Sequence, residues 1–196
     1  MGFEYLQGKN WKEITRDERY FCAELFFEIK HDTLSFVKWL SEKGVCKISD
    51  DEFNNQWEIG FEVCFYRDYI LMFGDDTGEK SISKTSYSPK RTFDLCLFSE
   101  KRIIIIEAKA QQGFKTNQNE EFLNDISQMM GLLKKNSNNF NVSVIALASS
   151  IYFENVKKHG NGLPAVFQGN YFSWKDIYES FSRRSIFEYA DKSYKN

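Results

Sequence analysis

The chain has 196 residues, of which 42% are hydrophobic and 28% are charged, and its formal net charge is −2. This length is sufficient for one domain with a full core, and the nearly balanced charge excludes a protein that binds nucleic acid through a general basic excess. We therefore expect a single domain over residues 1–196, with its core at about 15–190 and a frayed tail at 191–196.

The four cysteines form no CxxC pair, which argues against a zinc site and against a disulfide framework. They are Cys22, Cys46, Cys64 and Cys96. We expect buried free thiols in a reducing compartment. The N-terminal residues include no apolar signal region, and no apolar run approaches the length that spans a membrane. The sequence therefore predicts a cytoplasmic protein.

The first predicted elements are two helices. Thr15–Glu18 has the form of a capping box, which predicts a helix through residues 19–30. A second helix, over Leu34–Lys43, should end at Gly44. The apolar stripe of the first helix is Phe21, Cys22, Leu25, Phe26 and Ile29. Both helices should therefore pack one face against a common core.

Residues 57–73 alternate apolar and polar side chains at their start and predict a half-buried strand. The stretch 74–90 is polar and rich in turn residues, so we expect a loop or a loose hairpin there. Within it, Asp75 and Asp76 lack the spacing of an EF-hand and indicate a turn rather than a calcium site.

The segment Arg91–Ala110 predicts two strands joined by a tight turn. Because strand side chains alternate between faces, Asp94, Cys96 and Phe98 should point one way, and Phe93, Leu95 and Leu97 the other. The residues that share one face of the second strand are Ile103, Ile105, Glu107 and Lys109.

A turn centred on residues 100–101 pairs Phe98 with Ile103 and therefore sets Asp94 opposite Glu107, with side chains roughly 5 Å apart. Two carboxylates at that distance repel by roughly 3 kcal/mol at an intermediate dielectric. A cation between them would remove this cost, and oxygen ligands are those that Mg²⁺ prefers. The hairpin therefore predicts a divalent-metal site.

The remaining pattern predicts a helix over about Glu120–Lys135, a buried strand at 141–149, a short strand within 165–174 and a last amphipathic helix over Trp174–Tyr189. A strand–helix–strand crossover implies a parallel pair of strands. Together with the hairpin, this gives an α/β fold with a mixed central sheet and helices on both faces. The stripe expected to be buried in the 120–135 helix is Phe122, Ile126, Met129 and Leu133.

An Asp on one strand, then twelve residues, then Glu107-Ala108-Lys109 closing an apolar strand before a helix resembles the PD-(D/E)xK nuclease superfamily. The resemblance covers residues 58–147 and implies the restriction-endonuclease-like fold. Phe93 stands before Asp94 where the family motif has proline; the carboxylate carries the chemistry, and the proline only shapes the strand.

The resemblance implies a metal-dependent nuclease that hydrolyses phosphodiester bonds, with DNA as the expected substrate. Asp94, Glu107 and the Ala108 carbonyl would bind one or two Mg²⁺ or Mn²⁺ ions, and Lys109 would act on the attacking water. Glu24 on the first helix matches a glutamate that reaches the metal site in many members. Gln128 resembles a glutamine of the exonuclease-like branches.

Structural interpretations of the same residues stay open at this point. Glu107 and Lys109 could form a surface salt bridge worth little, and Asp94 could pair with Arg91 or Lys109. Glu24 and Gln128 could simply be solvated, as is expected of His31, whereas Glu62 could approach the site from the neighbouring strand. Basic pairs that could form a local nucleic-acid surface are Lys80/Lys84, Lys90/Arg91, Lys134/Lys135, Lys157/Lys158 and Arg183/Arg184.

Two alternative functions use the same fold. One is an RNA endonuclease with the same site, and the other is a catalytically inactive nucleic-acid or protein interaction module. A chain of this size has little material left for reading base sequence, so site-specific cutting would need the 75–90 loop, a homodimer or a partner subunit.

Overall fold

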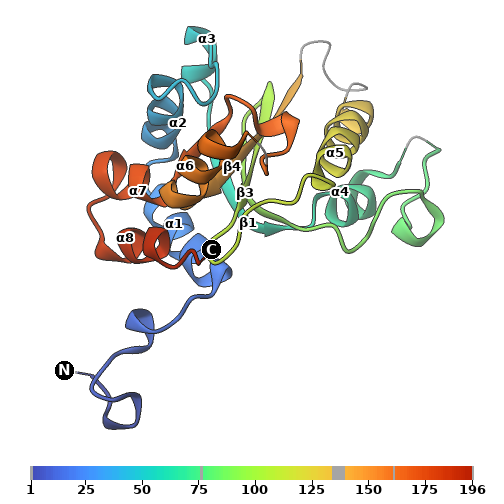
Figure 1. The fold of residues 1–196 in the computed structure, drawn as a ribbon. Helices are drawn as coiled ribbons and strands as arrows, with labels where there is room; N and C mark the ends of the chain where they lie inside the picture. The colour runs from blue at the N-terminus through green and yellow to red at the C-terminus, as the bar shows by residue number, and fades with distance from the viewer. Residues whose placement is uncertain (1, 76, 134–139, 161, 196) are drawn as a thin grey trace.

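The computed structural model describes residues 2–75, 77–133, 140–160 and 162–195, and these residues form a five-stranded sheet with helices packed around it (Figure 1). The strands lie in the order β1-β2-β3-β4-β5; the β1–β2 and β2–β3 pairs are antiparallel, and the β3–β4 and β4–β5 pairs are parallel. The fold is therefore α/β with a mixed sheet, as predicted. The strands are β1 (Glu58–Val63), β2 (Phe93–Phe98), β3 (Arg102–Ala108), β4 (Asn141–Ala148) and β5 (Tyr171–Ser173).

The described helices connect and cover these strands. The α-helices are α1 (Glu18–Ile29), α2 (Thr33–Glu42), α3 (Asp50–Phe53), α4 (Phe65–Phe73), α5 (Gln118–Leu133), α6 (Ser150–His159), α7 (Trp174–Asp176) and α8 (Ser185–Lys192). Short 3₁₀ turns are η1 (Glu4–Leu6), η2 (Trp11–Glu13), η3 (Ile82–Lys84) and η4 (Ala165–Phe167), and η5 (Ile177–Phe181) is a π-helical turn.

Two apolar cores lie on opposite faces of the sheet, because the isoleucines of β3 alternate between them. Ile104 and Ile106 belong to the first core, and Ile103 and Ile105 to the second. The first core also includes buried residues of α1, α2 and α8, and the second those of α4, α5 and α6. Helices therefore cover both faces, as predicted.

The alternation of β1 and β2 is broken at one pair of positions. Glu62 has a left-handed backbone, with φ at 51°, which is uncommon for a residue other than glycine. Phe61 packs against the first core, whereas Val63 and its partner Phe93 pack into the second. Phe93 therefore points away from Leu95, contrary to the prediction. The irregular backbone at Glu62 reverses the side-chain alternation in β1 and in the paired part of β2.

Three other segments differ from the prediction. Residues 65–73 form α4 rather than continuing a strand, since Phe65, Tyr66 and Ile70 are buried at helical spacing. Helix α6 was not predicted. The expected helix over 174–189 is interrupted at 182–184, where Ser182 is extended and buried.

The tail is held as far as Ser193 rather than frayed. Helix α8 continues to Lys192, and the buried Asp191 carboxylate accepts hydrogen bonds from the Ser150 amide at 2.7 Å and from the Lys175 amide at 3.1 Å. Ser193 is also buried. The polar composition of this segment indicated fraying, but the Asp191 carboxylate caps the first turns of α6 and α7.

The cysteines are free thiols: Cys22, Cys46 and Cys96 are buried, and Cys64 is half-buried. The expected turn at Asp75 is present, since its Oδ1 accepts from the Thr77 and Glu79 amides at 3.0 and 2.9 Å, while Asp76 lies outside the described residues. None of the helices in the described part of the chain combines the length and apolar character needed to cross a membrane.

Candidate functional site

The β2–β3 hairpin has the predicted register. Phe98 pairs with Ile103 and Leu95 with Ile106, and the Ser99 amide donates to the Arg102 carbonyl at 2.9 Å. Continuing this register brings Asp94 to the position opposite Glu107. Asp94 Oδ2 accepts a hydrogen bond from the Ala108 amide at 2.8 Å, so its carboxylate is held at the end of β3.

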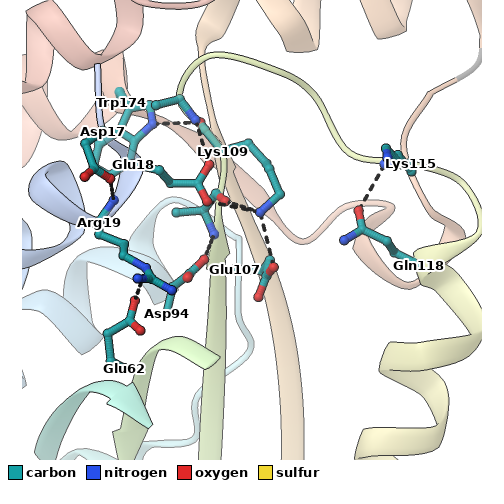
Figure 2. A network of polar contacts seen from close by, with 12 residues as sticks. Asp17, Glu18, Arg19, Glu62, Asp94, Glu107, Lys109, Lys115, Gln118 and Trp174 are labelled. Carbon is teal, nitrogen blue, oxygen red and sulfur yellow. Dashed lines mark hydrogen bonds and ion pairs between the residues drawn. The ribbon is translucent and has the colours of Figure 1, made fainter. Parts of the chain in front are cut away.

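The Lys109 ammonium lies among oxygen atoms at the end of β3 (Figure 2). Its Nζ donates to the Ala108 carbonyl at 2.6 Å, to Glu107 Oε1 at 3.2 Å and to Glu18 Oε1 at 3.3 Å. We refer to Glu18, Asp94, Glu107, Ala108 and Lys109 as the hairpin cluster. The four residues predicted for the metal site and its water therefore lie together, and Glu18 is a fifth that was not predicted.

The backbone of Lys109 is fixed from both sides. Its amide donates to the Leu147 carbonyl of β4 at 2.7 Å, and its carbonyl accepts from the indole Nε1 of Trp174 at 3.0 Å. Trp174 is fully buried in the first core. The lysine side chain therefore projects from a rigid frame although it lies beyond the last residue of the strand.

Glu18 is the site residue that sequence reasoning missed. Asp17, not Thr15, caps α1, because its carboxylate accepts from the Arg19 amide at 3.0 Å. Glu18 is thus free of the predicted capping box, and its Oε2 accepts from the Ala110 amide at 3.1 Å. A second potential cap two residues after Thr15 was the only sequence signal that could have suggested this role.

Burial and mutual repulsion change the proton affinities of the cluster. Burial, followed by the charge of Asp94, raises the pKa of Glu107 to about 7. Burial also raises the pKa values of Asp94 and Glu18. For Lys109, burial opposes the charged form, but the surrounding carboxylates outweigh it and the pKa is raised. The Lys109 ammonium therefore stays protonated beside Glu18 and Glu107, and Arg91 and Arg19 add positive charge near Asp94.

Glu24 lies away from the cluster, which corrects its predicted place. Its carboxylate is paired with Arg184, which also contacts Glu28 at 3.3 Å. Glu24 is six residues after Glu18, which is about 240° around the helix and about 9 Å along it. Both glutamates cannot face the hairpin, and the packing of α1 selects Glu18.

The other candidates lie outside the cluster. Glu62 pairs with Arg19 at 3.4 Å (Figure 2). Gln128 lines a pocket of about 210 Å³ beside Arg91, whose Nε donates to Asp125 at 2.8 Å. Arg91 therefore pairs with a residue of α5 and not with Asp94. His31 is exposed just after α1.

In three of the five predicted basic pairs, one residue is already in an ion pair with an acidic side chain. Lys84 pairs with Glu79 at 3.3 Å, and Arg91 and Arg184 are paired as described. Lys80, Lys90 and Arg183 are exposed. Lys157 and Lys158 lie in the last turn of α6, and Lys134 and Lys135 fall outside the described residues.

The donor atoms of the cluster suit a hard divalent cation, since all are carboxylate or carbonyl oxygens and their negative charge exceeds that of one ammonium. Within the described residues, however, no group of three His, Cys, Asp or Glu side chains is arranged to hold a metal ion. The Lys109 ammonium, rather than a metal ion, lies among the oxygens of Glu18, Glu107 and Ala108.

No family model matches this chain, and neither a curated protein nor a solved structure was found to be similar to it.

Proposed function

We propose that this chain is a divalent-metal-dependent nuclease of the PD-(D/E)xK type that hydrolyses phosphodiester bonds in DNA, and that its mixed sheet is of the restriction-endonuclease-like kind. One observation carries the proposal: three carboxylates, from α1, β2 and β3, converge with a lysine at the end of a hairpin. The Glu-x-Lys spacing of Glu107 and Lys109 places both side chains at the same end of β3, beside the Ala108 carbonyl.

The charge of the cluster supports a cation as its missing component. The buried carboxylate of Glu107, whose pKa is raised to about 7, is costly in its charged form, and the half-buried carboxylates of Glu18 and Asp94 lie beside it. Arg91 and Arg19 also act on Asp94, but they are paired with Asp125 and Glu62. A buried salt bridge alone would need only one carboxylate. The excess negative charge is what a divalent ion would neutralise.

Asp94, Glu107 and the Ala108 carbonyl would hold the ion, with Glu18 at the side of the cluster facing α1. When bound, Mg²⁺ or Mn²⁺ supplies a water of lowered pKa and neutralises charge on the phosphate. The Ala108 amide orients the Asp94 carboxylate through its 2.8 Å hydrogen bond. The Ala110 amide does the same for Glu18 at 3.1 Å.

Lys109 acts as an ammonium in this proposal. Its pKa is raised, so it is a poor general base and a good hydrogen-bond donor at neutral pH. It can orient the attacking water and donate to a non-bridging oxygen of the scissile phosphate as negative charge develops there. The fixed backbone at Lys109 keeps the side chain at this edge, and binding of the ion would require Nζ to leave the Ala108 carbonyl and Glu107.

Calorimetric titration with Mn²⁺ tests the metal site directly. The wild-type chain should bind Mn²⁺, and both Asp94→Asn and Glu107→Gln should abolish the binding. Glu24→Gln is the matched control, since it removes a charge from the same region without touching the cluster, and it should bind Mn²⁺ like the wild type. Binding that is independent of Asp94 and Glu107 would refute the site.

Incubation of single- and double-stranded DNA and RNA with Mg²⁺ or Mn²⁺ tests the activity, with Glu107→Ala as the inactive control. Cleavage of DNA supports the proposal, and cleavage of RNA alone would identify the RNA endonuclease. Metal binding without cleavage of any substrate would identify the interaction module.

The free thiols lead us to place the protein in the cytoplasm, a reducing compartment.

Exchange of Glu18 for glutamine should lower the cleavage rate about 10- to 100-fold, as expected for a group that orients a metal ligand or its water. The same exchange at Glu24 should leave the rate within about twofold of the wild type, because Glu24 is paired with Arg184. The comparison uses one helix and one chemical change. The opposite order of effects would show that α1 presents its other face to the substrate.

A further inference from the structure

A pocket of about 620 Å³ adjoins the hairpin cluster on the side of the N-terminal segment. Its lining includes Trp11, Arg16, Asp17, Glu18, Gln111 and Gln112. Glu18 is common to the pocket and the cluster, since its Oε1 accepts from Lys109 Nζ at 3.3 Å. A ligand in this pocket would therefore extend directly to the candidate site.

Trp11 provides an exposed aromatic wall. Trp11 is 59% exposed, whereas Trp39, Trp57 and Trp174 are 7%, 7% and 0% exposed. Trp11 belongs to neither apolar core. Figure 1 shows the N-terminal segment, in dark blue, extending away from the sheet beyond the start of α1. Packing against the rest of the chain therefore does not account for this indole.

The turn that carries Trp11 is ordered. The Asn10 amide donates to Glu13 Oε2 at 2.7 Å, which closes a capping box over η2, and the Thr15 amide donates to the Trp11 carbonyl at 2.9 Å. The indole is thus presented on a hydrogen-bonded turn just before α1. Such pre-organisation lowers the entropy cost of stacking a flat ligand on the ring.

The polar lining distinguishes between a base and a phosphate as the occupant. Asp17 and Glu18 place two carboxylates in the wall against the one guanidinium of Arg16, which is anchored by a 2.6 Å bond from Nη2 to the Ser193 carbonyl. A phosphate seated in the pocket between Asp17 and Glu18 would be repelled by this net negative charge, whereas a neutral base would not; a backbone phosphate beyond Glu18 would lie toward the Lys109 ammonium. Gln111 Nε2 already donates to the Arg16 carbonyl at 2.7 Å, which leaves the Gln111 side-chain oxygen and the Gln112 amide to hydrogen-bond a base edge.

We propose that this pocket binds one unpaired nucleotide of a single-stranded nucleic acid, with its base stacked on Trp11 and its backbone leading past Glu18 to Lys109. The inference rests on the proposed nuclease function and names its substrate class. A volume of about 620 Å³ lies in the range of sites for ligands of nucleotide size. A paired base is already stacked on its neighbours, so only an unpaired one can use the indole in their place.

Fluorescence provides the test, because Trp11 is the one strongly exposed indole among the four. A short single-stranded DNA is added in Ca²⁺, which neutralises the same carboxylates, and its integrity is checked on a gel. The strand should shield Trp11 from iodide quenching, and a blunt duplex of the same sequence should shield it less. Trp11→Ala should weaken binding of the single strand about tenfold, the loss expected for one stacked base.

Trp11→Phe should retain most of the affinity, because a phenyl ring still stacks. Tyr5→Ala is the matched control: Tyr5 is 80% exposed and lies outside the pocket, so binding should not change. Melting temperatures of all variants should agree with the wild type, which excludes loss of fold.

An unchanged affinity in Trp11→Ala, or iodide access that the strand does not alter, would overturn the inference. Cleavage in Mg²⁺ without shielding of Trp11 would overturn the inference and leave the nuclease proposal standing. Shielding without cleavage in Mg²⁺ or Mn²⁺ would overturn the nuclease proposal and leave the nucleotide pocket in place.

Discussion

Replacement of Lys109 by alanine should lower the rate of phosphodiester cleavage by about 10²- to 10⁴-fold while metal binding persists. The ammonium is the cation that contacts both Glu107 and Glu18, and it is placed to donate to water and phosphate. Its removal takes away a donor that matters most when charge develops in the transition state. Cleavage rates at saturating Mg²⁺, measured beside Mn²⁺ calorimetry, separate the two effects.

The same variant should bind Mn²⁺ at least as tightly as the wild type, because Nζ no longer lies among the oxygens of Glu18, Glu107 and Ala108. Lys192→Ala is the matched control, since Lys192 is exposed and pairs with its helix neighbour Glu188, and its cleavage rate should equal that of the wild type. Retained cleavage in Lys109→Ala would refute the catalytic role.

Glu107→Gln should stabilise the metal-free protein at neutral pH by roughly 3 kcal/mol, the value of a pKa raised from 4.5 to about 7. A carboxyl with a raised pKa holds its proton more tightly in the folded chain than in the unfolded one. Between about pH 4.5 and pH 7 the folded state therefore binds more protons, and the contribution of Glu107 to stability falls as the pH rises. Glutamine is neutral at every pH, so the variant does not lose this stability as the pH rises.

Urea unfolding of the wild type and of Glu107→Gln across this pH range, in the presence of a chelator, measures the effect as the difference between their free energies of unfolding. The gain from Glu107→Gln should be small below about pH 4.5, grow through the window and level off above about pH 7. Added Mn²⁺ should reverse the order by stabilising only the wild type. A difference in the free energy of unfolding that does not vary with pH would mean that the pKa of Glu107 is not raised in the folded protein.

Glu52→Gln serves as the control of opposite sign. Burial acts against the charge of Glu52, but hydrogen bonds from Arg102 and Ser49 outweigh it and lower its pKa. Its carboxylate therefore contributes stability above its unfolded pKa, which is lost as the pH falls through the folded value. This exchange should destabilise at neutral pH, with a deficit that shrinks at acid pH.

The hairpin was predictable from the sequence because its contacts are local. A turn of fixed length sets the register, and the register sets Asp94 opposite Glu107 with no information from the rest of the chain. The period of the apolar residues likewise indicated the mixed sheet and the two covered faces. Helix α4 and the break near Ser182 were not predictable in this way, because short amphipathic segments fit either period until their packing partners are known.

The amino-acid sequence by itself determined the paired acids, the lysine after them and the sheet that presents them, since each follows from spacing along one or two strands. Only the tertiary structure decided which glutamate of α1 joins them. Glu18 and Glu24 are equally good candidates on a helix drawn alone, and the choice depends on how the helix docks and on Arg184, which lies 160 residues from Glu24. The proton affinities also came from the fold, because burial of a carboxylate is a property of everything packed around it.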